Sequence, residues 1–223
     1  MPICAIYGRA RIDLSFRGVG SCSRDPLASV PMPAAPRFVG VVALLTVLAS
    51  GLVTACSSSS DSSTAGGRYS AAPAMTIDAN KHYSATITTA KGTITLDLDP
   101  KSAPISVNNF VFLARDGYYD GLTFHRVEAN FVVQGGDPTG TGNGGPGYTI
   151  PDEASPLLHT EGALGMAKST APNSAGSQFY MLLSAQPSLD GRYTVFGKVS
   201  SGMDVLKTIA RGDVMTKVTI TEQ

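Results

Sequence analysis

The sequence predicts a mostly β fold, a closed antiparallel barrel whose ends are covered by two α-helices. Two observations in the C-terminal two thirds of the chain lead to this prediction. Several short segments alternate apolar and polar residues, which is the pattern of half-buried strands. Two further stretches place apolar residues at helical spacing, and glycine and proline separate the segments. Many short strands with only two helices favour a barrel.

The first two strands are predicted to form a β-hairpin. Residues 83–89 (YSATITT) and 93–98 (TITLDL) both alternate, and the three aliphatic residues of the second segment share one face. Residues 90–92 (AKG) lie between them and are typical of a hairpin turn.

Two helices are predicted from apolar spacing and from their end signals. The first covers about 103–115, with Ser102 as a possible N-cap, Pro104 in the first turn and Gly117 as the stop. The second covers about 202–210. The remaining β-rich segments are 122–127, 131–136, 162–167, 177–184, 193–199 and 214–221.

The glycine-rich segment 135–147 (GGDPTGTGNGGPG) is predicted to be an irregular surface loop. It lacks the Lys-Ser/Thr pair of a phosphate-binding P-loop, and no helix signal follows it.

Charge and cysteine content exclude several classes of protein. The chain has 17 basic and 17 acidic residues. Residues 1–55 hold five of the basic and two of the acidic ones, so the rest carries 12 and 15, a net charge of −3. A mildly acidic domain is a poor nucleic-acid binder. The three cysteines are Cys4, Cys22 and Cys56, so neither a disulfide within the segment after Cys56 nor a CxxC zinc or redox site there is expected.

The front of the chain is predicted to be a lipoprotein signal. Residues 38–53 form an apolar run preceded by Arg37, shorter than the roughly 20 residues that span a bilayer. Val53–Cys56 (VTAC) resembles a bacterial lipobox, in which the cysteine becomes the lipidated first mature residue. An ordinary signal peptide with a coincidental cysteine is the alternative. We therefore expect lipidation of Cys56 and a bacterial cell membrane location, on the extracytoplasmic face.

These patterns divide the chain into four parts. Residues 1–31 do not fit a signal and are predicted to be an over-extended reading frame or disordered, with translation starting at Met32. Residues 32–55 are the signal peptide. Residues 56–75, rich in Ser, Gly and Ala, are expected to be a flexible tether, and 76–223 the folded domain.

Three segments of the folded domain together resemble one family. They are FHRVEANFVVQGGDP, GMAKSTAPNSAGSQFYMLLS and SLDGRYTVFGKV, within 124–199. They resemble the cyclophilin family of peptidyl-prolyl cis/trans isomerases, and the resemblance runs in order from about residue 83 to 221. It implies an eight-stranded barrel with two capping helices and an enzyme that isomerises X-Pro bonds.

The resemblance also implies the site residues. Arg126 matches the family's catalytic arginine, and Gln134 the amide that holds the substrate backbone. Phe131, Val132, Tyr180 and Leu189 match the proline pocket, Ala167, Lys168 and Gln178 match the groove for residues before proline, and Tyr193 stands where histidine is common.

Three departures from the family pattern are expected to matter. Val132 stands where methionine is frequent, which shortens the pocket wall. Tyr180 replaces a common phenylalanine, so its hydroxyl needs a hydrogen-bond partner. Ser188 stands where the family has the tryptophan that binds cyclosporin, so we expect weak inhibition by cyclosporin.

No general base or metal is expected. Isomerisation makes and breaks no bond to hydrogen, so His125 is predicted to fill a structural site beneath Arg126. His82 and His159 are too scattered for a metal triad. We expect a monomer without cofactor or metal that acts on proline-containing polypeptides among exported proteins, is anchored to the membrane and binds no nucleic acid. The alternative is a proline-peptide binding module or holdase chaperone with incidental catalysis.

Overall fold

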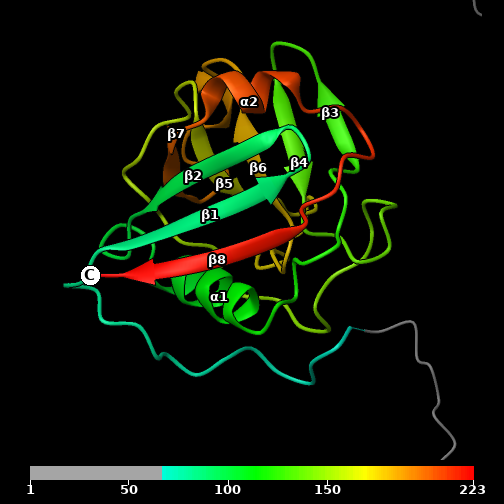
Figure 1. Ribbon diagram of the computed structural model, residues 1–223. Helices are drawn as coiled ribbons and strands as arrows, with labels where there is room; N and C mark the ends of the chain where they lie inside the picture. The colour runs from blue at the N-terminus through cyan, green and yellow to red at the C-terminus, as the bar shows by residue number, and fades with distance from the viewer. Residues whose placement is uncertain (1–66) are drawn as a thin grey trace, which may run out of the picture. The chain divides into compact units, whose positions relative to one another are not determined.

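The computed structural model describes residues 67–223 (Figure 1). Its first two strands, β1 (Tyr83–Thr89) and β2 (Gly92–Leu98), form the predicted hairpin, paired from Tyr83 with Leu98 to Thr89 with Gly92. Alternate residues of β1 are buried, as the sequence pattern requires. The hairpin prediction is confirmed.

The first helix, α1 (Pro104–Arg115), lies where it was predicted, but its N-terminus is capped differently. The N-cap residue is Ala103, and the Ser102 hydroxyl donates instead to Asp99 Oδ2 at 2.8 Å. The carboxylate of Glu153 accepts the backbone N–H of Ile105 at 2.8 Å and that of Ser106 at 2.7 Å. A distant acidic residue thus satisfies the free N–H groups of the first turn and complements the helix dipole.

The rest of the domain consists of short strands, one 3-10 turn and a second short helix. These elements are β3 (Arg126–Glu128), β4 (Val132–Gly135), β5 (Ala163–Met166), β6 (Phe179–Leu182), η1 (Pro187–Leu189), β7 (Val195–Ser201), α2 (Met203–Thr208) and β8 (Lys217–Glu222). Figure 1 shows α1 beside β8 and α2 beside β2, on opposite sides of the hairpin. The described residues contain no helix with the length and apolar character needed to cross a membrane.

The eight strands form one antiparallel sheet in the order β3-β4-β6-β5-β7-β2-β1-β8. The predicted closed barrel is wrong, because the sheet is curled but its edge strands β3 and β8 do not pair. β3 has only three residues. The chain before it meets the chain before β8 at one antiparallel bridge, Thr123 with Val214, and through flanking backbone hydrogen bonds such as that from the Phe124 N–H to Asp213 O at 2.9 Å. Irregular chain, rather than a continuous ladder, fills the gap.

Two apolar clusters fill the domain. The larger one packs α1 against the sheet, with Phe110 5.0 Å from Tyr119 and 5.3 Å from Phe179 between ring centroids. The smaller cluster is built on Val132, Ala163, Tyr180, Leu182 and Val195. Partly buried side chains of Phe131, Leu157, Ala167 and Tyr193 pack on it. This second cluster supports the candidate site.

Residues 67–75, which the sequence analysis assigned to the tether, lie against the domain. The Tyr69 ring packs at 5.3 Å from Phe112 and its hydroxyl donates to Asp116 at 2.5 Å. The backbone N–H of Tyr69 donates to Pro146 O at 2.8 Å. Packing therefore begins before residue 76.

Candidate functional site

A cavity of about 140 Å³ lies over the second cluster. It is lined by Arg126 of β3, Phe131, Val132 and Gln134 at β4, Ala167 and Lys168 after β5, Tyr180 and Leu182 of β6, Leu189 of η1, and Tyr193. The structure thus brings together every predicted site residue in the domain except Gln178, which lines the adjoining groove. Leu182, which the sequence analysis did not name, belongs to the wall.

Arg126 stands at the mouth of this cavity because β3 pairs with β4. The register sets Arg126 opposite Gln134, and the guanidinium Nη1 donates to Gln134 Oε1 at 3.3 Å. The guanidinium carbon lies 5.4 Å from the centre of the Phe131 ring, within cation–π range. A cation, an amide and an aromatic ring therefore border the same cavity.

Glu128 is a neighbour of this site that the sequence analysis missed. Its Oε1 accepts from Arg126 Nε at 2.8 Å and pairs with Nη2 at 2.8 Å. The two residues are separated by one position on β3, so their side chains share a face. That spacing was the available signal. The guanidinium carries five N–H donors, so hydrogens remain on both terminal nitrogens for a substrate.

Tyr180 forms part of the cavity wall, and its hydroxyl has the partner that the sequence analysis called for. The hydroxyl lies 2.8 Å from His159 Nε2, in the interior. Tyr180 is 6% exposed, so its ring faces the cavity while its polar end is held below it. Burial raises the pKa of Tyr180 above its usual value, and the hydroxyl keeps its proton.

A chain of amides links the cavity to the adjoining groove of about 430 Å³. Gln134 Nε2 donates to Gln178 Oε1 at 2.9 Å, and Gln178 Nε2 donates to the carbonyls of Gly142 and Gly144, both at 2.9 Å. Gly136 allows the end of β4 to lie against Ser177, the residue before Gln178, since its φ is 87° and a Cβ there would overlap the Ser177 carbonyl.

Comparisons with known proteins place the chain. Residues 84–223 match the family described as cyclophilin type peptidyl-prolyl cis-trans isomerase/CLD. The chain belongs to this family.

Two relatives illustrate the likeness. Peptidyl-prolyl cis-trans isomerase B of Bacillus subtilis is 51% identical over 129 residues, which are 57% of this chain and 90% of that protein. The crystal structure of a Cryptosporidium parvum cyclophilin type peptidyl-prolyl cis-trans isomerase has a TM-score of 0.60 and 32% identity, covering 64% of this chain and 99% of that one. A second Cryptosporidium structure, in the presence of the dipeptide Ala-Pro, gives 0.59 at 32% identity, covering 63% and 99%.

Lys168 of this cyclophilin borders both the cavity and the groove. Its Nζ donates to Asp152 Oδ2 at 2.6 Å and lies 5.9 Å from the centre of the Tyr193 ring. Partial burial alone would raise the pKa of Asp152, but the bonds from Lys168 and from the Asn173 N–H hold it below its usual value. The carboxylate therefore stays charged and fixes the lysine beside Tyr193.

His125 lies next to Arg126 in the chain and is 8% exposed, so it is buried as expected. Neither ring nitrogen has a hydrogen-bond partner among the described residues. Burial lowers the pKa of His125 below its usual value, and the charges of Arg126 and Arg211 add to this effect against that of Asp137. The ring is therefore held neutral.

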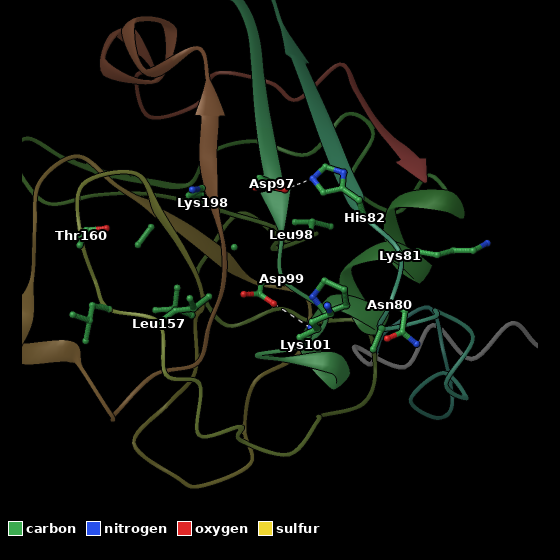
Figure 2. Close-up of a pocket in the computed structure, with 16 residues that line it drawn as sticks. Asn80, Lys81, His82, Asp97, Leu98, Asp99, Lys101, Leu157, Thr160 and Lys198 are labelled. Atoms are coloured by element: carbon green, nitrogen blue, oxygen red, sulfur yellow. Dashed lines mark hydrogen bonds and ion pairs between the residues drawn. The ribbon is translucent and has the colours of Figure 1, made fainter. Parts of the chain in front are cut away.

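A hollow larger than this cavity lies apart from the candidate site. It measures about 480 Å³ and is bordered by residues 79–82, 97–101, 157, 158, 160, 163, 195, 197 and 198, without any of the predicted site residues. Figure 2 shows the His82 ring directed at Asp97, with which it pairs at 2.7 Å. The charged residues at the rim of this hollow are thus partly paired with one another. No group of three His, Cys, Asp or Glu side chains that could hold a metal ion occurs among residues 67–223.

Proposed function

We propose that this cyclophilin accelerates the folding of exported proteins by twisting X-Pro bonds, with Arg126 as its catalytic residue, while a lipid on Cys56 holds it at the outer face of a bacterial membrane. The observation that carries the mechanism is the shared cavity of Arg126, Phe131 and Gln134. The dipeptide Ala-Pro present in the Cryptosporidium relative's structure supports a proline-containing ligand.

The amount by which a catalyst must lower the rotation barrier follows from the chemistry of the peptide bond. Resonance between nitrogen and carbonyl sets a rotation barrier of about 18–20 kcal/mol. At 20 kcal/mol the uncatalysed rate is on the order of 0.01 per second, which agrees with the slow isomerisation of X-Pro bonds. A catalyst working at roughly 10³ per second must lower the barrier by about 7 kcal/mol.

Arg126 is suited to lower this barrier because the nitrogen changes character during the twist. In the planar amide its lone pair is delocalised, whereas in the twisted state it becomes a hydrogen-bond acceptor. A guanidinium N–H directed at that nitrogen stabilises the twisted state more than the planar one, and such differential binding raises the rate. Glu128 and Gln134 hold the guanidinium in place beforehand, so less reorganisation is needed.

The remaining residues of the cavity and the groove bind different parts of the substrate. Phe131, Val132, Tyr180 and Leu189 enclose an apolar space for the pyrrolidine ring. Gln134 offers its amide to the backbone on the carbonyl side, and Ala167, Lys168 and Gln178 border the groove for the preceding residues. A water-poor pocket also disfavours the charge-separated resonance form of the amide, which weakens the resistance to rotation.

The membrane part of the proposal rests on sequence alone. Residues 32–55 and Cys56 lie outside the described residues. Several acyl chains on Cys56 would anchor the protein firmly, because each buried CH₂ contributes about 0.8 kcal/mol. Metabolic labelling with palmitate and cell fractionation test this: labelled, membrane-bound protein is expected, and Cys56→Ser should lose the label and be released. An unlabelled wild-type protein in the soluble fraction would contradict the anchor.

A protease-coupled proline-peptide assay on the purified chain distinguishes an isomerase from the alternative function, a proline-peptide binding module or holdase. An enzyme converts cis to trans peptide at catalytic protein concentrations, many turnovers per molecule. A proline-peptide binding module or holdase would bind the peptide at stoichiometric concentration and leave the isomerisation rate at its uncatalysed value.

A further inference from the structure

A buried link runs from the surface to the wall of the candidate pocket through three side chains. His159 Nδ1 lies 2.8 Å from Asp190 Oδ1, and His159 Nε2 lies 2.8 Å from the Tyr180 hydroxyl. The His159 side chain is only 1% exposed, whereas that of Asp190 is 30% exposed. We call Asp190, His159 and Tyr180 the His159 link.

The partners of the His159 link fix the direction of its hydrogen bonds. The Asp190 carboxylate only accepts, so His159 Nδ1 carries the donated proton. In the tautomer with its single ring proton on Nδ1, Nε2 is an acceptor, and the Tyr180 hydroxyl donates to it. Asp190 also accepts the backbone N–H of His159 at 2.8 Å, and these two bonds hold its pKa below its usual value.

The same contacts fasten His159 to the turn that carries another part of the pocket. Asp190 follows η1, whose last residue is Leu189 of the cavity wall. On the other side of the turn, the Gln186 N–H donates to the His159 carbonyl at 2.7 Å. One buried histidine therefore connects the Tyr180 wall with the Leu189 wall.

The Tyr180 ring also has little freedom on its far side. Gly165 of β5 pairs with Tyr180 of β6, and a Cβ on Gly165 would overlap the Tyr180 ring. The ring thus lies directly against the backbone of Gly165, in a space that no side chain could share. On its other sides it stacks on the His159 ring at 6.1 Å between ring centroids and meets the Tyr193 ring edge-to-face at 6.3 Å.

We propose that His159 and Asp190 are positioning residues that hold Tyr180 in the proline pocket and thereby set the affinity for the proline ring, without touching the substrate. This inference rests on the proposed function, because it assigns a task to the wall of that pocket. Arg126 lies outside the His159 link, so the rate of the twist itself should not depend on it.

Steady-state kinetics with a proline peptide test this with Tyr180→Phe, Asp190→Ala and the double variant. Tyr180→Phe loses the hydrogen bond to His159, and Asp190→Ala loses the two bonds from His159 to the carboxylate, so KM should rise by about threefold to tenfold in each single variant. The value of kcat should stay within about twofold, because the lost binding energy is the same in the ground state and in the transition state. If Asp190 acts through Tyr180, the double variant has the KM of Tyr180→Phe alone. Asp204→Ala, which removes an exposed carboxylate from α2, is the matched control and should match wild type.

A spectroscopic measurement distinguishes the proposed positioning role of His159 and Asp190 from a general structural effect of the substitutions. Nitrogen-15 NMR of wild type should show His159 protonated on Nδ1, and Asp190→Ala should change that tautomer. Multiplying KM effects in the double variant, an unchanged KM in Asp190→Ala, or an Nε2-protonated His159 in wild type would each overturn the proposal. If wild type shows no turnover, the proposed function fails, and Kd values for Ala-Pro from NMR titration of the same variants test the His159 link separately.

Discussion

The guanidinium carbon of Arg126 lies 5.4 Å from the centre of the Phe131 ring. The cation therefore stands at the edge of an apolar wall, half in water and half against the cavity, with a side-chain exposure of 46%. Electrostatic interactions strengthen as water is excluded. A bound proline ring that covers this edge would remove the remaining water just where the twisted nitrogen needs a donor.

Glu128→Gln should lower kcat/KM by up to about fivefold, because exposed ion pairs contribute up to roughly 1 kcal/mol. The variant loses the charge that orients the guanidinium through Nε and Nη2. Peptide kinetics measure the effect, with Glu161→Gln as a control, since that carboxylate pairs with Lys207 away from the cavity. A Glu128→Gln enzyme as active as wild type would show that Gln134 and Phe131 suffice to orient Arg126.

The domain should lose stability in acid because of His125. Its folded-state pKa lies below the ordinary value of 6.5, so the unfolded chain takes up a proton at a pH where the folded chain does not. The free energy of unfolding therefore falls as the pH drops below about 6.5 and stops falling below the folded pKa.

Urea unfolding at a series of pH values, for wild type and His125→Leu, isolates this contribution. The leucine variant should show a shallower loss of stability between neutral and mildly acid pH. It also removes two buried nitrogens that lack partners among the described residues, so its stability at neutral pH should not suffer from lost hydrogen bonds. Parallel pH curves for the two proteins would contradict the account.

Gly165→Ala should displace the Tyr180 ring, because the new methyl group would overlap it. Overpacking of this kind costs about 1–3 kcal/mol, so the melting temperature should fall by several degrees and KM should rise. Gly145→Ala is the stability control, since nothing lies within 4 Å of its added Cβ. A Gly165→Ala protein with wild-type melting and wild-type KM would mean that the Tyr180 ring is freer than the structure indicates.

Cyclosporin should inhibit this protein weakly while peptide turnover is retained. Ser188, at the family's cyclosporin-binding tryptophan position, is an exposed residue of η1 beside Leu189, so the drug would lose a large contact surface. Inhibition curves in the peptide assay measure this, and Ser188→Trp should shift them to lower drug concentration. Sub-micromolar inhibition of wild type would sink this prediction.

Local patterns made much of the fold predictable. Alternation over 83–98 and helical spacing over 103–115 depend on neighbours in the chain, and the structure has both elements there. Closure of the sheet depends instead on the register between β3 and β8, whose first residues, Arg126 and Lys217, are 91 positions apart. No local sequence pattern indicates that register, and the barrel prediction was wrong at the gap between β3 and β8. Glu153 capping α1 is another long-range contact of the same kind.

The candidate site could likewise be predicted from the sequence only in part. The family motifs indicated which residues would surround the cavity, and the fold brings them together. The sequence also showed that the Tyr180 hydroxyl needed a partner, but not that His159, itself held by Asp190, would provide it, since those contacts join β6, the loop before β5 and the turn after η1. Glu128 was within reach of sequence reasoning, because residues two apart on a strand share a face.

The most direct test of the account is the turnover of Arg126→Ala. The side chain is largely outside the core, so the variant should fold with the melting temperature of wild type. Arg115→Ala, which removes a surface arginine paired with Glu222, is the matched control. Loss of a preorganised donor predicts a fall in kcat by about 10²–10³ for Arg126→Ala alone. A folded Arg126→Ala protein that isomerises the peptide at the wild-type rate would contradict the central claim.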